Sequence, residues 1–294
     1  MYDRLLFPTD GSEGAERAFE HVLDVAAAHG ATVHVLAVAD TARDSVTQVR
    51  GEVVDALETE GEETVAAAAD RASERGVETV TEVLQGDPAS TIVDYADDRD
   101  VDLVVMPTRG RTGLSRLLLG SVTERVVRQA EVPVLTLRPE ELDGLTYPYE
   151  DVLVPTDGSE CARAALEVGI DAATADGAAL HVLSVVDVTS LGMDVRAQAQ
   201  VDALEEHAND TVADAVDVAT EAGLASVSGD VAFGSSVYRT ILEAVTERDA
   251  DLVVVGTHGR TSVDRLLLGS VAEKLVRLSP VPVMTVRGPL PSGD

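Results

Sequence analysis

Two glycine-rich stretches have the residue types and the spacing of a loop that binds phosphate groups through its backbone. In the second stretch, two residues separate Gly256 from Gly259, and nine residues then precede Gly269 and Ser270. Glycine allows positive φ angles and a close approach of the backbone to a ligand. The first N–H groups of a helix have no partner inside that helix, so a Gly-Ser pair that begins a helix offers donors to an anion.

The earlier stretch is a near copy that differs at its first position. It reads PTRGRTGLSRLLLGS from Pro107 to Ser121, against GTHGRTSVDRLLLGS from Gly256 to Ser270. Proline in place of the first glycine removes one N–H donor and fixes φ near −65°. Since a lost buried donor typically costs about 1 to 3 kcal/mol, the sequence leaves open whether the first stretch binds an anion.

The duplication extends over the whole chain. LLFPTDGSE from Leu5 returns as VLVPTDGSE from Val152, an offset of 147, and EVPVLTLR near residue 131 returns as SPVPVMTVR near residue 279. Two halves of this length are each an ordinary size for one hydrophobic core. We therefore expect a first domain at 1–138, a Pro- and Gly-containing linker at 139–149, a second domain at 150–288 and a tail at 289–294.

Short Val- and Leu-rich runs alternate with Ala-rich amphipathic stretches in both halves. The runs lack a polar alternate face, which is typical of strands buried on both sides in a parallel sheet. The pattern predicts a doubly wound α/β domain in each half. The expected strands are near 3–8, 31–38, 77–84, 102–106 and 132–137, and near 150–155, 178–186, 226–233, 250–255 and 281–286; helices of the first half are expected at 12–28, 53–74, 90–98 and 121–130.

A carboxylate follows the first strand of each half, within Pro-Thr-Asp-Gly-Ser. In open α/β sheets, ligands bind beyond the carboxyl ends of the strands where the strand order reverses. If strands one and four are neighbours, Asp10 and Asp157 face the glycine loops and can accept hydrogen bonds from a base or a sugar. Each carboxylate is equally suited to capping the helix that follows, so both interpretations stay open.

The composition is strongly acidic. Asp and Glu number 53 against 22 Lys and Arg, a formal net charge of −31, and only Lys274 is a lysine. Residues 1–149 carry −16 and residues 150–294 carry −15, so the charge is not confined to a tail. The composition resembles that of proteins from salt-accumulating halophiles. We expect folding and solubility to improve in molar KCl, where a Debye length of about 3 Å screens the self-repulsion.

The same composition argues against several classes of function. Nucleic-acid binding draws on clustered Lys and Arg, and the chain shows neither a basic patch nor a tryptophan. Membrane insertion and secretion are not expected, because no apolar run approaches 18 residues and the start lacks a long apolar signal segment. The single cysteine, Cys161, fits a reducing cytoplasm and is interpreted as a core residue. No His, Cys and carboxylate cluster has metal-ligand spacing.

Taken together, these motifs resemble a tandem universal stress protein over nearly all of both halves. The resemblance is carried by the PTDGS opening, the second strand around HVL, the G-x2-G-x9-G-S/T loop and the closing V-P-V strand. It implies a Rossmann-like fold of five parallel strands in the order 3-2-1-4-5. It also implies ATP binding, with AMP or ADP as alternatives, and Mg²⁺ or Mn²⁺ carried on the phosphates. In the family the last strands pair across a two-fold axis, so the resemblance suggests an intrachain pseudo-dimer and leaves a homodimer open.

The resemblance assigns site residues to each half. Asp157 and the backbone of Val185 would hold adenine or ribose, and the glycine loop would hold the phosphates. The candidate nucleotide-binding residues of the second half are Pro155, Thr156, Asp157, Val185, Gly256, His258, Gly259, Arg260, Gly269, Ser270 and Val271. Those of the first half, where Pro107 departs from the pattern, are Pro8, Thr9, Asp10, Val38, Arg109, Gly110, Arg111, Gly120, Ser121 and Val122.

No residue is assigned a catalytic role. The chain lacks the G-x4-G-K-[ST] loop of P-loop NTPases, and an ATPase would need a positioned base or water. Arg109 could supply charge to a phosphate or reach solvent, and Arg111 and Arg260 could screen phosphates or pair with carboxylates. A nucleotide-binding sensor or switch with little or no hydrolysis is favoured. An interaction scaffold with vestigial sites and an ATP α-hydrolase on the same fold are the alternatives.

Overall fold

The chain consists of two compact units, each with its own core. The computed structural model describes residues 2–40, 51–110, 119–188, 195–259 and 268–288, without the side chains of 51–56 and 195–200. Contacts within the chain divide it into Met1–Pro148 and Tyr149–Asp294. Each unit alternates strands and helices, as the repeat predicts.

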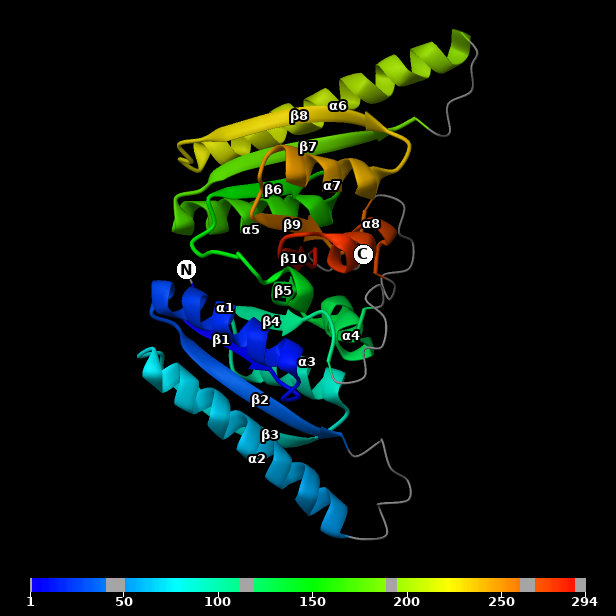
Figure 1. The fold of residues 1–294 in the computed structure, drawn as a ribbon. Helices are drawn as coiled ribbons and strands as arrows, with labels where there is room; N and C mark the ends of the chain where they lie inside the picture. The colour runs from blue at the N-terminus through cyan, green and yellow to red at the C-terminus, as the bar shows by residue number, and fades with distance from the viewer. Residues whose placement is uncertain (1, 41–50, 111–118, 189–194, 260–267, 289–294) are drawn as a thin grey trace. The chain divides into compact units, whose positions relative to one another are not determined.

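The first unit contains five strands (Figure 1). Its elements are β1 (Arg4–Pro8), α1 (Glu13–His29), β2 (Thr32–Asp40), α2 (Gly51–Glu74), β3 (Thr79–Gly86), α3 (Pro88–Asp98), β4 (Leu103–Pro107), α4 (Ser121–Gln129), β5 (Val134–Leu137) and the short 3-10 helix η3 (Pro139–Glu141).

The second unit repeats this succession. Its elements are β6 (Asp151–Pro155), α5 (Glu160–Asp176), β7 (Ala179–Asp187), α6 (Val195–Glu221), β8 (Val227–Gly234), α7 (Val237–Glu247), β9 (Leu252–Gly256), α8 (Ser270–Leu278) and β10 (Val283–Val286). The predicted strands all occur, with ends shifted by at most a few residues.

Each unit has the predicted strand order, β3-β2-β1-β4-β5 in the first and β8-β7-β6-β9-β10 in the second. All the pairings described within a unit are parallel; Leu5, for example, lies opposite Val33 on one side and Leu103 on the other. In each unit the second and third strands therefore lie on one side of the first strand, and the fourth and fifth strands lie on its other side. The fourth strand is the neighbour of the first, as the site hypothesis requires.

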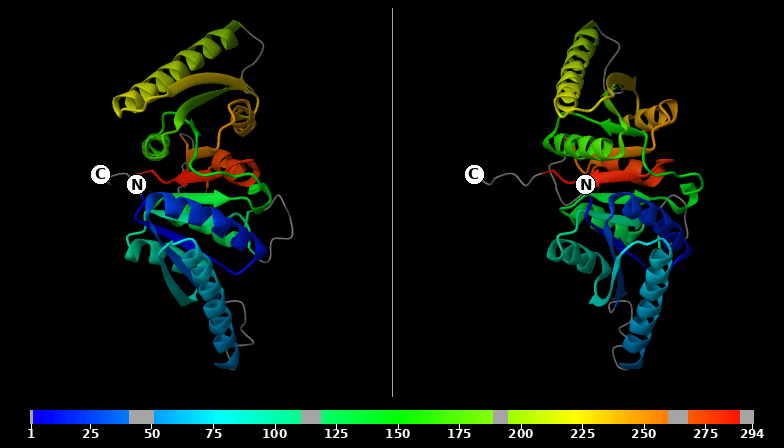
Figure 2. Two further views of the ribbon diagram at one scale, coloured as in Figure 1. Left: turned by 60° about the vertical axis from the view of Figure 1, so that its left-hand side comes forward. Right: turned by 90° about the vertical axis from the view of Figure 1, so that its left-hand side faces the viewer.

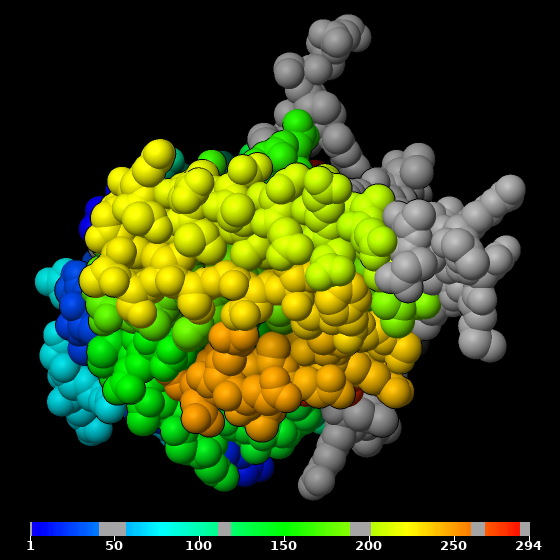
Figure 3. Space-filling view, turned by 90° about the horizontal axis from the view of Figure 1, so that it is seen from above, coloured from blue at the N-terminus to red at the C-terminus, as the bar shows by residue number. Residues whose placement is uncertain are grey.

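Helices cover both faces of each sheet (Figure 2). In the first unit α1 and α2 contact one another and the sheet, while α3 and α4 form a second contacting pair; α5 with α6, and α7 with α8, repeat this in the second unit. The central strands are buried on both faces, which explains their unbroken Val and Leu runs. In Figure 3 the yellow-green, yellow and orange atoms of the second unit belong to α6, β8 and α7.

The first helix of each unit has the same two ends. Ser12 and Ser159 are N-caps whose hydroxyls accept from the backbone N–H of Ala15 at 3.3 Å and of Ala162 at 3.2 Å. Both helices end at a glycine in the left-handed region that such a C-cap requires. These caps fix where the chain leaves the first strand and turns back over the sheet.

The segment that follows β5 lies against the first unit. A Cβ atom placed on Gly14 would approach Pro139 Cγ to 2.9 Å. The Arg17 guanidinium pairs with Asp143 at 2.7 Å, and His29 Nε2 lies 2.5 Å from the Tyr147 hydroxyl. Much of the stretch expected to link the domains is therefore held by α1.

Candidate functional site

In the second unit, the loop after β6 is a compact turn that holds Asp157 at the carboxyl edge of the sheet. The Thr156 hydroxyl accepts from Gly158 N at 3.2 Å, and Asp157 Oδ1 accepts from Ser159 N at 3.0 Å. Gly158 has φ near 75°, a conformation that glycine adopts without strain.

The other carboxylate oxygen of Asp157 lies directly against the glycine loop after β9. A Cβ atom on Gly259 would come within 2.8 Å of Asp157 Oδ2, closer than real Cβ contacts allow. The carboxylate and the loop backbone thus share one edge of the sheet, as the sequence predicts. A Cβ atom at 259 would therefore push the Asp157 carboxylate away from the loop.

The last glycine of the motif positions the start of α8. Gly269 N donates to Thr257 O at 2.8 Å, and a Cβ at 269 would approach that same oxygen to 2.9 Å. Among the side chains that the structure describes, none forms an N-cap hydrogen bond with the first turn of α8. Because Ser270 and Val271 open this helix, their backbone N–H groups lie at an end where the helix dipole favours an anion.

Gly256, the first glycine of the motif, is explained by packing against α5. A Cβ at this position would lie 2.8 Å from Cys161 O and 3.1 Å from Cys161 Sγ. Cys161 is buried, as predicted for a core residue, and its Sγ lies 3.6 Å from the Thr257 hydroxyl. Sequence reasoning missed this contact, since the two residues are far apart in the chain.

His258 lies within the same loop. Its Nδ1 is 3.0 Å from the hydroxyl of the buried Thr257. Its Nε2 is buried, and no hydrogen-bond partner for it occurs among the described residues. Buried polar atoms of this kind call for a specific explanation.

The remaining candidates of the second half lie at the same edge. Thr156 N donates to Leu183 O at 2.8 Å, which ties the end of β6 to β7. Val185 lies two residues further along β7, opposite Ala232 of β8 and half-buried. The site thus collects Pro155, Thr156, Asp157, Val185, Gly256, His258, Gly259, Gly269, Ser270 and Val271 at the carboxyl ends of β6, β7 and β9, while Arg260 lies outside the described residues.

The first unit places the corresponding residues in the same way. Ser12 N donates to Asp10 Oδ1 at 3.1 Å, and a Cβ on Gly110 would collide with Asp10 Oδ2. Gly120 N donates to Thr108 O at 2.8 Å, as Gly269 does to Thr257. Pro8, Thr9, Val38, Ser121 and Val122 occupy the matching strand ends and helix start, while Arg111 lies outside the described residues.

Arg109 is where the two loops differ most. Its guanidinium forms an ion pair with Glu140 of η3, and the same carboxylate oxygen accepts from Arg138 at 2.9 Å. The Arg109 side chain is only 14% exposed. Of the two roles left open by the sequence, reaching solvent is therefore wrong for this residue. Glu140 was not predicted, because it lies in the stretch expected to be a linker.

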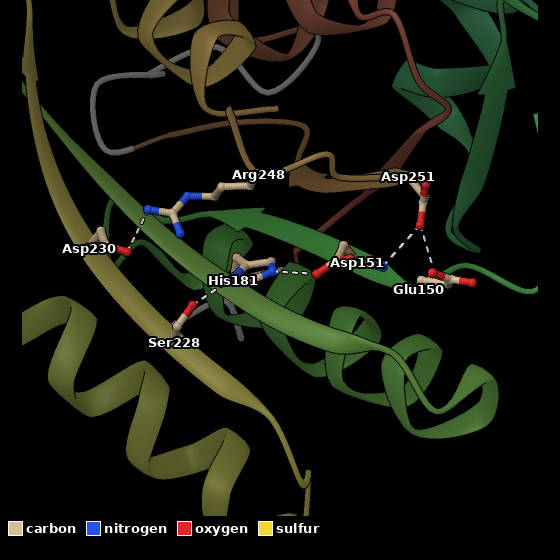
Figure 4. Close-up of polar contacts among 7 residues, drawn as sticks. All are labelled: Glu150, Asp151, His181, Ser228, Asp230, Arg248 and Asp251. Carbon is tan, nitrogen blue, oxygen red and sulfur yellow. Dashed lines mark hydrogen bonds and ion pairs between the residues drawn. The ribbon is translucent and has the colours of Figure 1, made fainter. Parts of the chain in front are cut away.

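A second polar cluster lies at the opposite, amino-terminal edge of the second unit (Figure 4). His181 Nε2 is 2.7 Å from Asp151 Oδ1, and its Nδ1 is 2.7 Å from the Ser228 hydroxyl. Arg248 pairs with Asp230 at 2.6 Å, and Asp251 accepts from the backbone of Glu150 and Asp151. These contacts tie together the starts of β6, β7, β8 and β9.

The described part of the chain contains no group of three or more His, Cys, Asp or Glu side chains placed to hold a metal ion. No helix in the described residues has the length and hydropathy needed to cross a membrane.

Known proteins match both units. The model of the universal stress protein family matches residues 1–138 and 148–287. A universal stress protein of Methanocaldococcus jannaschii is 38% identical over 141 residues, 47% of this chain and 83% of that protein. One from Mycobacterium tuberculosis is 31% identical over 242 residues, 78% of each chain.

A solved structure covers almost the whole chain. The crystal structure of a universal stress protein from Archaeoglobus fulgidus has a TM-score of 0.74 and 25% identity, covering 97% of this chain and 98% of that one. The family match falls on both halves and includes the glycine loops that the fold places beside Asp10 and Asp157. The chain belongs to the universal stress protein family and carries two of its domains in tandem.

Proposed function

We propose that the protein is a nucleotide-binding regulatory protein of the stress response, and that the second unit carries its principal ATP site. The observation that supports this most strongly is the approach of Asp157 to Gly259 beside the start of α8. A carboxylate that accepts hydrogen bonds from sugar or base then lies next to backbone donors suited to phosphate.

Two features of the second-unit loop support a nucleoside triphosphate as the ligand. Glycines at 259 and 269 leave the backbone bare where any larger side chain would strike Asp157 or Thr257. Phosphates at the first turn of α8 would approach backbone N–H groups, and the buried Nε2 of His258 belongs to the same loop. Mg²⁺ or Mn²⁺ would be carried by the phosphates. AMP and ADP present the same base and sugar and are alternative ligands.

The proposed role is a sensor or switch with little or no hydrolysis. A ligand that binds only the folded protein stabilises it in proportion to its concentration relative to Kd. Binding of nucleotide to either unit would thus stabilise the loops that contact the nucleotide, and this stabilisation is the proposed signal. The competing proposal, an interaction scaffold with vestigial sites, predicts no such stabilisation.

Paired glycine variants test the proposal. Gly259→Val puts a side chain against Asp157, and Gly110→Val does the same against Asp10 in the first unit. Titration calorimetry with ATP-Mg in molar KCl should show that Gly259→Val weakens the tighter binding event. The affinity of that event should fall at least about tenfold, because charge-assisted hydrogen bonds to the nucleotide are lost. Gly110→Val should leave that event in place.

Thermal unfolding of each variant without ligand serves as the control that the variant is folded. ATP-Mg should raise the melting temperature of the wild type and of Gly110→Val more than that of Gly259→Val. Unchanged stoichiometry and affinity in Gly259→Val would refute the second-unit site. A wild type that neither binds ATP-Mg nor gains stability from it would favour the scaffold.

A further inference from the structure

Three charged side chains of the first unit meet beside its glycine loop. Arg109 lies in that loop, between Thr108, whose carbonyl accepts from Gly120 N, and Gly110, which lies against Asp10. Its guanidinium contacts Glu140, and Arg138 contacts the same carboxylate oxygen at 2.9 Å. The carboxylate of Glu140 is thus held against Arg109 beside the glycine loop.

The three groups are partly removed from water. The side chains of Arg109 and Arg138 are each 14% exposed, and that of Glu140 is 25% exposed. Burial by itself would raise the pKa of Glu140, but hydrogen bonds from its own backbone and from Arg138, with the charges of both arginines, lower it. The carboxylate is therefore ionised at neutral pH, and its attraction to the arginines is screened less than that of a surface pair.

The fold holds Glu140 in this place. It belongs to η3, which begins two residues after β5 ends, and Pro139 packs over Gly14 in the first turn of α1. Thr108 N donates to Leu137 O at 2.8 Å, which fixes the loop against the strand that leads into η3. The anion and the loop are therefore positioned by the same strand end.

The second unit has no counterpart of this anion in its sequence. His258 replaces Arg109, and Arg287 corresponds to Arg138. The chain then continues as Gly288-Pro289-Leu290, with no carboxylate where the first unit has Glu140. In the second unit His258 turns to the Thr257 hydroxyl at 3.0 Å.

We infer that Glu140 is an internal competitor for phosphate at the first unit, which a nucleotide must displace from Arg109 in order to bind there. The inference rests on the proposed nucleotide-binding function. Glu140 thus inhibits the first site, whereas the second site has no such competitor. The second site should therefore fill before the first as the nucleotide concentration rises. Pro107 is then not the main cause of a weak first site.

The test compares two neutralising variants that differ only in which carboxylate is lost. Both Glu140→Gln and Glu141→Gln are made in the Gly259→Val background, so that the first site is measured alone. Glu141 lies beside Glu140 and contacts Arg138 at 3.4 Å, which makes its variant a control for the change in net charge. ATP-Mg is titrated by calorimetry at one fixed KCl concentration.

Glu140→Gln should raise first-site affinity about five- to tenfold, the range expected between an exposed ion pair and a charge-assisted buried one. Glu141→Gln should change it by less than about twofold, and adding Arg109→Gln to Glu140→Gln should abolish the gain. Thermal unfolding without ligand shows whether each variant folds.

Two kinds of failure are distinguishable. If the second site of the wild type binds ATP-Mg but Glu140→Gln has no effect, or no more effect than Glu141→Gln, the inference about Glu140 is wrong and the proposed function stands. If neither site of the wild type binds ATP-Mg, the proposed function is wrong and the inference is overturned with it.

Discussion

In both units the first turn of the first helix contacts the chain that follows the last strand. The glycine of this contact lies on the helix in the first unit and on the chain after the last strand in the second unit. In the first unit Gly14 makes room for Pro139. In the second the bulk is on the helix, because Cys161 occupies the position of Gly14, and Gly288 makes room for it, with a Cβ at 288 approaching Cys161 Cα to 2.9 Å. The larger residue of the pair is thus on the strand side in the first unit and on the helix side in the second unit, and the fold is the same in both.

The difference at the first motif position belongs to this exchange. Gly256 lies under the carbonyl of Cys161, whereas Pro107 stands at the matching position of the unit whose helix carries Gly14. The Pro107 carbonyl also accepts from the buried Thr123 hydroxyl at 3.0 Å. A motif glycine can thus reflect packing against a helix as well as access to a ligand.

The comparison between the units can be tested most strongly through pH, because only the first unit has a histidine in the buried face of its first helix. His21 of α1 is 4% exposed, and burial lowers its pKa to about 4, partly offset by Asp24. The matching residue of α5 is Val168. The native first unit therefore favours neutral His21, while the unfolded chain takes up a proton below pH 6.5.

The contribution of neutral His21 to stability is present above pH 6.5 and is lost as the pH falls from 6.5 towards 4, by about 3 kcal/mol in all. His21→Val, which installs the residue of the second unit, should remove that part of the acid sensitivity. Hydrogen exchange of the α1 amides in molar KCl between pH 7 and 4 measures it. An identical pH slope in the variant and the wild type would contradict the assignment, and exchange of the α5 amides is the internal control.

The sequence predicts the fold closely because the repeat supplies each element twice. The Val- and Leu-rich runs are local signals, and they place the ten strands of the described residues to within a few residues. The juxtaposition of Asp157 and Gly259 follows from strand order, which was implied by the family resemblance. Glu140, Cys161 with Gly256, and the cluster around His181 depend on contacts between residues distant in sequence, so no local pattern indicates them.

A second way to test the comparison is to place alanine at both matching motif positions, 107 and 256. Gly256→Ala places its Cβ 2.8 Å from Cys161 O and should destabilise the second unit by about 1 to 3 kcal/mol, the usual cost of overpacking. Pro107→Ala only trims a side chain and should cost the first unit about 1 kcal/mol or less. Calorimetric unfolding without ligand compares the two variants. Equal losses of stability in the two variants would mean that the contact with α5 is not the reason for glycine at position 256.

The smallest expected difference is at the amino-terminal edge, where both units use one aspartate in the same way. Asp102 Oδ2 accepts from Asp3 N at 2.8 Å and Arg4 N at 2.9 Å, and Asp251 Oδ2 accepts from Glu150 N at 2.8 Å and Asp151 N at 3.1 Å. Replacement by alanine should cost each unit about 1 kcal/mol, because these N–H groups lie at the surface or partly buried and largely regain water.

The charges around the two aspartates make these losses unequal. The segment bound by Asp102 carries one charge of each sign, Asp3 and Arg4, whereas the segment bound by Asp251 carries two negative charges, Glu150 and Asp151. Removing the charge of Asp251 therefore relieves repulsion from two carboxylates, whereas at Asp102 the charge of Arg4 offsets that of Asp3. Asp102→Ala should accordingly be the more costly change by a few tenths of a kcal/mol in dilute salt. The gap should close in molar KCl, where the Debye length is about 3 Å. A gap that persists at high salt would assign the difference to the hydrogen bonds themselves.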